Sequence, residues 1–598
     1  MKSPIIVEWL DNLLTENKTV RDQVHGDIVL NVVECAVIDT QIFQRLRRIK
    51  QLGTVDLVFP GAEHSRFQHS LGTLHVADLL VKNIIKNCPR KIGDVQQKAF
   101  ILVVRLAALL HDLYELPLSH TLEKEGHVFG KQWKDEDLNK VIFGEDSQLF
   151  SVISKAIVGL VDKSSQIQKT LIANQWTSNE RVKLAFDVSA TILALVYKIL
   201  AETTEEPSKI VEKLFGKKVD FLEIFDEKLL DVAGYIIRNT ICADLLDYLL
   251  RDFQLCGIDK KYDKRFLVYS TLFFKDDAKK GKQEVVFAYS LMDKRGRIKQ
   301  SVLSSLLDVL ELRYSLAEVV HTHRVKNAFS AMVIESFNLY YQLLDDSGKK
   351  AELKNLLLTT GDYELLQYLR EKNADSKYVL DYYFEHHNYR EFVLWDKWEN
   401  VINSHALSKK GLDLLNDACF RLFLEKTLVN WINKSLPKNK QLRNGDILFY
   451  VMPNPEYLWK ELEANVIYQG NDGQPKVGTL RSLSENNVLN PMSPMMNAIV
   501  RRIEGQRNLL QAKYCNLWRV SMFLSPRINV EEDSDYREIP NVLSDLVGKM
   551  FKLQGIEAKP TEIETLVIMP EELNQILLKI QKERRSFWTM KELYEFSL

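Results

Sequence analysis

The chain has 598 residues, of which 46% are hydrophobic and 27% are charged, and its formal net charge is −1. This length exceeds one ordinary hydrophobic core, so two or three lobes are expected. The balanced charge excludes a strongly basic nucleic-acid-binding surface over the whole molecule and leaves open only a local basic groove. The chain begins without a signal-peptide pattern, has no apolar run of the ~18 residues that a membrane span needs, and its six cysteines lack C-x-x-C spacing. These features favour a reduced, cytoplasmic protein that does not enter a membrane.

Helical patterning dominates from the N-terminal side of the chain. Residues 99–110 are apolar except for Arg105, which predicts a buried core helix. Pro117 breaks this pattern, and a new helix is predicted from about Ser119.

The middle of the chain continues with helices and one hairpin. Residues 235–256 predict an apolar-rich helix that ends at Gly257, and residues 303–339 have helical periodicity. The alternating segments 265–274 and 283–291 flank a turn-like lysine-rich stretch, which predicts a β-hairpin.

The C-terminal side changes character. Residues 346–436 predict a helical extension, whereas 437–598 contain the strand-like segments 447–451 and 465–468 and predict a small α/β lobe with a regulatory or oligomerisation role. The expected fold is mainly α: a helical core in residues 1–345 with a smaller C-terminal α/β lobe.

One predicted helix carries an unusual polar stripe. Asp244, Tyr248 and Asp252 follow one another at intervals of four residues, with Arg251 beside the last of them, while the intervening positions are mostly leucine. A polar stripe on a buried helix is costly unless it is paired, hydrated or bound to a metal. The sequence leaves two interpretations: an internal salt-bridge network around Arg251, or a set of metal ligands.

A His-Asp pair ends the apolar run of the core helix. His111 and Asp112 alone are weak evidence, because a helix end also accommodates such residues. In combination with another imidazole and another carboxylate they would form a mixed nitrogen and oxygen site that suits Mn²⁺, Fe²⁺, Mg²⁺ or Zn²⁺. Such a site leaves coordination positions for water and a phosphate oxygen.

The motifs together resemble the HD superfamily, specifically the deoxynucleoside triphosphate triphosphohydrolases. The F-Q-R-L-R-x-I-K-Q-L-G and H-x-R-F-x-H-S-L-G runs are the most specific, and the resemblance covers roughly residues 20–345. The matching stretches are 24–28, 38–53, 60–72, 111–112, 117–123 and 244–252.

The resemblance implies a role for each matching residue. It implies a divalent metal (Mn, Mg, Fe or Zn) with four protein ligands: His69, His111, Asp112 and Asp244. It implies that substrate is contacted at the α-phosphate by Arg66, at the triphosphate by Arg313, at the sugar 3′-hydroxyl by Gln51 and Asp252, and at the deoxyribose by Tyr248.

A catalytic pair is also implied. His120 and Glu123 match the His-carboxylate pair of the family, and their i, i+3 spacing on one helix face would let the carboxylate orient the imidazole. His64 lies near the metal motif, where we expect it to support a ligand rather than to be one.

Four positions depart from the residues of some relatives, and they bear on substrate identity more than on the metal core. Glu115 and Asp135 stand where relatives have histidine, Leu245 replaces a lysine, and His321 replaces a tyrosine. A bare carboxylate at Glu115 would repel a triphosphate. It therefore either pairs with a nearby base such as Lys124 or helps to hold a second divalent cation.

Three functions compete. The first is a deoxynucleotide triphosphohydrolase that is regulated by a nucleotide effector, forms a homo-oligomer and has an antiviral role through depletion of deoxynucleotides. The second is a phosphohydrolase or phosphodiesterase that acts on another nucleotide or on single-stranded nucleic acid. The third is a non-catalytic nucleotide sensor, against which the intact ligands, His120 and Glu123 argue.

Overall fold

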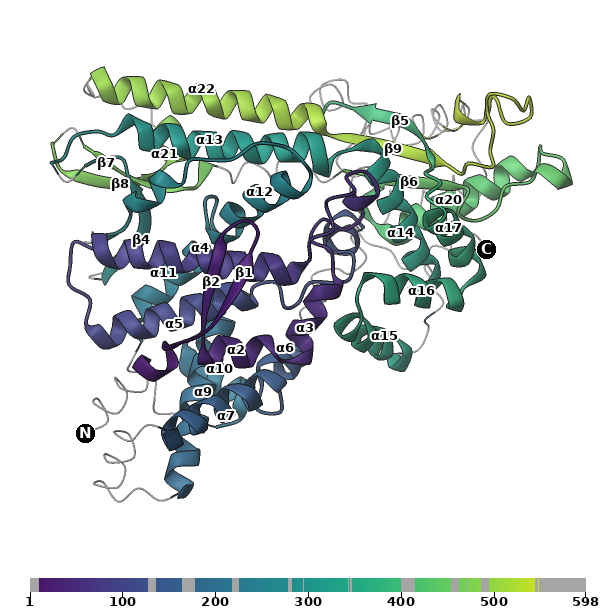
Figure 1. The fold of residues 1–598 in the computed structure, drawn as a ribbon. Coiled ribbons are helices and arrows are strands. Elements are labelled where there is room, and N and C mark those ends of the chain that lie inside the picture. Colours follow the sequence, from purple (N-terminus) through teal and green to yellow (C-terminus); the bar gives the residue numbers. More distant parts are fainter. Residues whose placement is uncertain are drawn as a thin grey trace, which may run out of the picture.

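A computed structural model of the chain describes residues 10–126, 136–163, 178–217, 225–277, 282–293, 295–341, 344, 347–398, 415–452, 462–470, 472–485, 494–541, 543 and 547. Helices predominate in this part of the chain and the sheets are small, so the predicted mainly α fold with a smaller C-terminal α/β part is confirmed (Figure 1). No helix among the described residues is long and apolar enough to cross a membrane.

The N-terminal part is a bundle of helices with a short hairpin against it. The hairpin consists of β1 (Glu16–Asp22) and β2 (Gly26–Asn31). The helices and helical turns are α2 (Val32–Ile38), α3 (Gln41–Gln44), η1 (Arg45–Arg48), η2 (Val55–Leu57), α4 (Arg66–Asn87), α5 (Asp94–Leu110), η3 (Thr121–Glu125), α6 (Glu136–Phe143), α7 (Gln148–Lys163), α9 (Ser178–Ala201), α10 (Pro207–Phe215), α11 (Glu227–Arg238) and α12 (Ala243–Leu255).

The predicted core helix is the C-terminal part of α5. It begins five residues earlier than the apolar run, at Asp94, and residues 99–110 are almost entirely buried in the larger of two hydrophobic clusters. Its one charged residue, Arg105, forms ion pairs with Glu34 (2.7 Å) and Asp78 (2.8 Å), which compensates the burial of the guanidinium.

The predicted helix 235–256 is in fact two helices. α11 ends at Arg238 and α12 begins at Ala243, because Asn239 and Cys242 have extended backbones. The apolar periodicity runs across this break and therefore does not reveal it. The break places Asp244 in the first turn of α12. Gly257 follows the helix with a φ of +71°, as the predicted end requires.

The segment predicted as helical over 303–339 is likewise interrupted. It contains α13 (Gln300–Leu316), a π-helical turn η7 (Ala317–His321) and α14 (Arg324–Tyr341). The helices of the predicted extension follow as α15 (Ser347–Thr359), α16 (Asp362–Lys372) and α17 (Ala374–Phe384).

The predicted hairpin is confirmed, and its sheet extends to the C-terminal part. η6 (Lys264–Tyr269) leads into β3 (Ser270–Asp277), which pairs antiparallel with β4 (Lys282–Ser290). β4 pairs in parallel with β7 (Asn465–Gln469), and β7 pairs with β8 (Pro475–Thr479), which gives the strand order β3-β4-β7-β8. The C-terminal segment thus completes a sheet that the N-terminal part begins.

A second sheet forms the other side of the C-terminal part. Its order is β5 (Arg390–Asp396), β9 (Arg519–Leu524), β6 (Ile447–Val451), with antiparallel pairing. The smaller hydrophobic cluster lies between this sheet, α14, α17 and α20 (Ala418–Asn433). The remaining elements are η8 (Lys438–Lys440), α21 (Leu480–Glu485) and α22 (Pro494–Leu517), a long helix that runs beside α13 (Figure 1).

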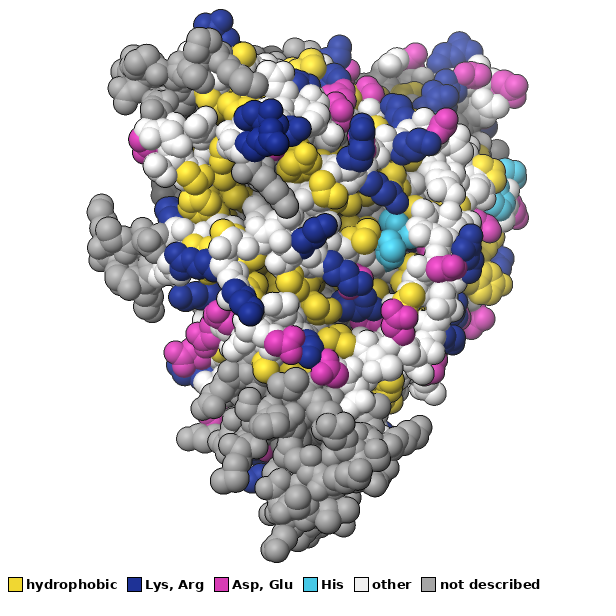
Figure 2. All heavy atoms as spheres, turned by 60° about the vertical axis from the view of Figure 1, so that its left-hand side comes forward, with side chains coloured by type: hydrophobic (Ala, Val, Ile, Leu, Met, Phe, Trp, Pro, Cys, Tyr) yellow, Lys and Arg dark blue, Asp and Glu magenta, His cyan; other side chains and the backbone are white. Residues whose placement is uncertain are grey.

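Charges of both signs share the surface, as the small net charge suggests. On the face of Figure 2, Lys and Arg side chains spread over the upper and middle parts with hydrophobic side chains between them, and Asp and Glu side chains lie in the lower middle as well as toward the edges. No disulfide joins the five cysteines whose side chains are described, Cys35, Cys88, Cys242, Cys256 and Cys515.

A pair of buried acids in the smaller cluster makes stability depend on pH. Glu335 on α14 and Glu425 on α20 interact through their side chains, and burial raises the pKa of both carboxyl groups above their usual value. The folded state therefore retains protons that the unfolded chain loses above about pH 4.5. We expect the free energy of unfolding to fall as pH rises from there toward neutrality, by at most about 1.4 kcal/mol per pH unit for each retained proton.

Urea unfolding between pH 5 and pH 8 measures this slope. Glu425→Gln should flatten it, since an amide cannot lose the proton, whereas Glu371→Gln on the exposed side of α16 should leave it unchanged. A Glu425→Gln protein with the wild-type slope would refute the assignment.

Candidate metal centre and adjoining cavity

Side chains from three separate elements converge on one point. His69 lies in the first turn of α4, Asp244 in the first turn of α12, and His111 and Asp112 directly after α5. His69 Nε2 is 3.0 Å from Asp244 Oδ1 and 3.2 Å from His111 Nε2, and His111 Nε2 is 3.4 Å from Asp112 Oδ1. The donor atoms of His69, His111 and Asp112 all lie within 4.8 Å of one another, as a shared cation requires. The four residues predicted as ligands are therefore brought together.

The second nitrogen of each imidazole is held by the protein. His69 Nδ1 is 2.7 Å from Asp247 Oδ2, and His111 Nδ1 is 2.8 Å from the carbonyl oxygen of Ala108. These contacts turn both Nε2 atoms toward the centre of the cluster. A histidine that binds a metal commonly has this arrangement, with a carboxylate or carbonyl at the other nitrogen. The donor set thus fits a divalent metal.

The carboxylate behind His69 belongs to a buried network that the sequence did not reveal. Asp247 accepts two hydrogen bonds of 2.9 Å from Arg251, and its Oδ1 is 2.6 Å from His25 Nε2. Arg251 also donates to Asp22 at 2.9 Å. The network lies so close to α4 that a Cβ on Gly72 would be 1.8 Å from Asp247 Oδ1, so only glycine fits there.

Of the two interpretations of the polar stripe on α12, the salt-bridge network around Arg251 is observed, and the metal-ligand set stays a prediction. Arg251 does neutralise buried aspartates, but they are Asp247 and Asp22, while Asp244 faces the two histidines. Asp247 was missed because it interrupts the i, i+4 series. Its position three residues after Asp244 and four before Arg251 was the available signal.

The cluster concentrates negative charge. Burial opposes ionisation of Asp112, but Arg66 and the two histidines outweigh it and hold the pKa of that carboxyl well below its usual value. Burial alone would lower the pKa of His69, but hydrogen bonds to Asp244 and Asp247 raise it to about 10. A group of ionised carboxylates that attracts a proton so strongly also attracts a divalent cation.

Arg66 links the metal cluster to the next loop. Its side chain is 3% exposed and donates to Asp112 (2.7 Å), Glu115 (2.9 Å) and the hydroxyl of Ser119 (3.0 Å). It therefore lies beside the cluster, where its predicted contact with the α-phosphate would require it.

The carboxylate of Glu115, which unpaired would repel a triphosphate, is paired with two bases. Its Oε1 is 2.9 Å from Arg66 Nη2 and 3.0 Å from His120 Nδ1. Although burial would raise the pKa of Glu115, Arg66 and His120 lower it to about 2. The carboxylate is thus already paired with two bases, whereas the side chain of Lys124, the base proposed for it, lies outside the described residues.

The helix predicted from Ser119 is reduced to one turn. Leu118 and Ser119 have φ values of +63° and +51°, and the turn that follows is the π-helical η3. His120 precedes this turn and Glu123, which is half-buried, lies within it. Because a π-helix is wider than an α-helix, the expected i, i+3 geometry does not apply, and orientation of His120 by Glu123 stays a prediction. His120 pairs with the carboxylate of Glu115.

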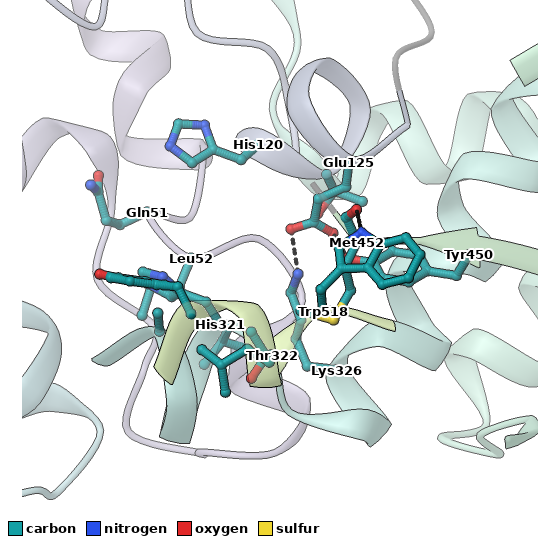
Figure 3. A pocket seen from close by; sticks show the side chains of 15 residues that line it. Gln51, Leu52, His120, Glu125, His321, Thr322, Lys326, Tyr450, Met452 and Trp518 are labelled. Carbon is teal, nitrogen blue, oxygen red and sulfur yellow. Dashed lines mark hydrogen bonds and ion pairs between the residues drawn. The ribbon is translucent and has the colours of Figure 1, made fainter. Parts of the chain in front are cut away.

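His120 opens onto a cavity of about 300 Å³ between the N-terminal bundle and the C-terminal sheet. Figure 3 shows Gln51 and His120 at one end and Trp518 at the other, with the ion pair of Glu125 and Lys326 between them. Tyr450, Met452, His321 and Leu52 complete much of the wall. The side-chain oxygen of Gln51 is buried and has no hydrogen-bond partner among the described residues, so it is available to a ligand.

The other predicted substrate residues, Asp252, Tyr248 and Arg313, are not among the residues that line this cavity. Asp252 is buried and its Oδ1 is 2.8 Å from His64 Nε2, so His64 supports Asp252 and is not part of the metal cluster. Tyr248 is half-buried against the main core, and Arg313 lies in the last turn of α13 near Cys242.

The departures from the family pattern have different surroundings. Burial lowers the pKa of His321 to about 4, and Leu245 is buried in the main core. Lys326, which lines the same cavity as His321, is buried in its ion pair with Glu125. Asp135 lies outside the described residues.

Similarity to known proteins agrees with this site. No family model matches the chain. It is 25% identical over 463 residues to the chicken (Gallus gallus) protein named deoxynucleoside triphosphate triphosphohydrolase SAMHD1, covering 73% of this chain and 67% of that protein. It is 28% identical over 355 residues to the Danio rerio protein of the same name, covering 57% and 49%. It is 40% identical over 159 residues to the uncharacterized protein YwfO of Bacillus subtilis, covering 26% and 34%.

These likenesses confirm the resemblance that the motifs predicted, to the deoxynucleoside triphosphate triphosphohydrolase group, and they support an enzyme of the HD type. The aligned part spans about half the length or less of several of these relatives, including those from Danio rerio, Xenopus laevis and Mus musculus.

The carboxylate behind His69 is expected to govern metal affinity. Asp247→Asn loses the charge that orients and polarises His69, so we expect Mn²⁺ to bind ~10–100-fold more weakly. Titration calorimetry of metal-free protein measures this. Asp446→Asn is the matched control, because Asp446 is equally buried and ion-paired, with Arg527, but lies beside β6. That control should lose stability and keep its metal affinity; an Asp247→Asn protein with wild-type affinity would contradict the assignment.

Proposed function

We propose that this chain is a divalent-metal-dependent hydrolase that cleaves deoxynucleoside triphosphates to deoxynucleoside and triphosphate. The observation that carries the proposal is the continuous path from the His-His-Asp cluster through Arg66 and Glu115 to His120 at the mouth of the cavity. The names of the related proteins support the same reaction.

The residues divide the chemical work. A metal held by His69, His111, Asp112 and Asp244 would lower the pKa of a bound water and neutralise phosphate charge. Arg66 would stabilise the charge on the phosphoryl oxygens of the α-phosphate. His120 would hold and deliver the proton at the leaving 5′-oxygen, with Glu115 fixing its ring by contact with Nδ1.

The cavity would take the nucleoside. Gln51 at its edge and Asp252, which is fixed by His64, would bind the 3′-hydroxyl, and Tyr248 would pack against the sugar in a way that favours deoxyribose. Arg313 would contact the triphosphate. The proposal extends to four further properties: regulation by a nucleotide effector, assembly into a homo-oligomer, a cytoplasmic location and an antiviral role through depletion of deoxynucleotides.

A second candidate is a phosphohydrolase that acts on another nucleotide. Glu115 favours it, because this carboxylate occupies Arg66 at a position where some relatives have a histidine that can face phosphate.

Product analysis separates these candidates. With Mn²⁺ and each deoxynucleoside triphosphate in turn, we expect mass spectrometry to detect deoxynucleoside and intact triphosphate, with dATP preferred over ATP. His111→Ala and Asp112→Ala should abolish both hydrolysis and metal retention while the fold persists. Release of monophosphate or pyrophosphate, or equal turnover of ATP and dATP, would refute the first candidate.

Substitutions of His120, the proposed general acid, and of Glu115, which contacts its ring, test the assignment of the proton donor. His120→Ala should retain the metal and lose ~10²–10⁴-fold in kcat, as the removal of a general acid does. Glu115→Gln should lose less, because it removes the charge that pairs with His120 and Arg66 but leaves the proton donor itself in place. Combining the two should add little to the loss in His120→Ala, since residues that act as a unit are not additive. Loss of bound metal in His120→Ala would show instead that His120 is a ligand.

A further inference from the structure

A carboxylate from outside the N-terminal bundle joins two loops of the site. Asp362 is the first residue of α16, and its side chain is buried. Its Oδ1 accepts a hydrogen bond of 2.6 Å from the backbone N–H of Leu118, and its Oδ2 accepts one of 2.8 Å from the backbone N–H of Lys50. Each carboxylate oxygen thus holds a different loop.

Both loops lead directly into proposed site residues. Lys50 precedes Gln51 at the edge of the cavity, and Leu118 precedes Ser119 and His120. The hydroxyl of Ser119 donates to the carbonyl oxygen of Lys50 at 2.5 Å and accepts from Arg66, so the two loops are also bonded to each other.

The second loop has a backbone that needs external support. Leu118 and Ser119 are consecutive non-glycine residues in the left-handed region, with φ values of +63° and +51°. Such a conformation is unfavourable for L-residues and persists only where surrounding contacts impose it. The loops also pack closely, because a Cβ on Gly53 would lie 2.9 Å from the carbonyl oxygen of Leu118.

A second contact attaches the same helical segment to the start of this loop. Arg45 donates to the carbonyl oxygen of Leu357 on α15 at 2.9 Å and to that of Glu115 at 2.8 Å. The α15–α16 segment is therefore connected to the loop at two places. Arg45 links it to Glu115, and Asp362 binds Leu118 directly.

We propose that Asp362 is a positioning residue: by binding the N–H groups of Leu118 and Lys50, it fixes His120 and Gln51 relative to the metal cluster. This inference rests on the proposed function, because it concerns the residues to which that function assigns the chemistry. Under this proposal the helical extension, through α16, helps to position residues of the site.

Hydrogen exchange tests the contacts without any assay of activity. Asp362→Ala should speed exchange at the amides of Leu118 and Lys50, which lose their acceptor. Glu364→Ala is the matched control, since Glu364 lies in the same first turn of α16 but pairs with Arg48 and Gly361. It should leave exchange at both amides and the activity unchanged. Wild-type protection of Leu118 and Lys50 in Asp362→Ala would overturn the proposal.

Kinetics test the route through His120. Asp362→Ala should lower kcat by ~10–100-fold at unchanged metal content, because small misplacements of catalytic groups cost factors of this size. KM should rise as well, because the loop that carries Gln51 loses the same support, and this rise should persist when His120 is replaced, a pattern that general destabilisation would not give. In a His120→Ala background the same substitution should change kcat by less than about twofold, whereas an equal loss in both backgrounds would overturn the proposal.

Asp362→Asn covers the case in which the alanine variant does not fold. It keeps one oxygen acceptor and should show an intermediate kcat, and wild-type kcat in this variant together with wild-type exchange would overturn the proposal. If the wild-type protein hydrolyses no deoxynucleotide, the proposed function fails, and the exchange measurement alone then decides whether Asp362 holds the loops.

Discussion

The site depends on the burial of one carboxylate, Asp247, between Arg251 and two histidines. Asp247 receives hydrogen bonds from Arg251 and lies within hydrogen-bond distance of His25 and His69, and these come from α12, the β1–β2 hairpin region and α4. Removal of a carboxylate from water is so unfavourable that it is tolerated only with such a complete set of partners. The hairpin and the two helices must therefore meet in one arrangement, and that arrangement points His69 at the metal cluster.

Much of this arrangement could be predicted because it depends on residues near in sequence. The apolar run predicts a buried helix with His111-Asp112 at its end, whereas only the family resemblance implies that these two residues are metal ligands. The alternating pattern around residues 265–291 predicts the β3–β4 hairpin. The interruptions at 239–242 and 317–321 were not predicted, because hydrophobic periodicity continues through them. Both segments are helical as predicted, but the break before Ala243 divides them into two helices and places Asp244 in the first turn of the second.

Contacts between distant segments account for the part of the site that the sequence did not show. Asp22 is joined to Arg251, and Asp362 to Lys50 and Leu118, and no local pattern marks either aspartate. Glu115 illustrates a different difficulty. Its closeness to His111 and His120 in sequence suggested a conflict of charge, but the outcome depended on Arg66, which enters from the start of another helix. Similarly, the positive φ values at Leu118 and Ser119 could not be read from residue types that rarely adopt them.

The C-terminal part contributes to the wall of the cavity in which the proposed function places the substrate. Tyr450 and Met452 from the β6 strand region and Trp518 beside β9 form a wall of the cavity that His120 and Gln51 open onto, and Lys326 joins this wall through Glu125. Tyr450 also donates to Glu125 at 3.0 Å, so the second sheet is bonded to the turn that follows His120. A shift of this sheet would move both the wall of the cavity and the catalytic turn. Changes that begin in the C-terminal part can therefore reach the site through these contacts, without any direct contact with the metal ligands.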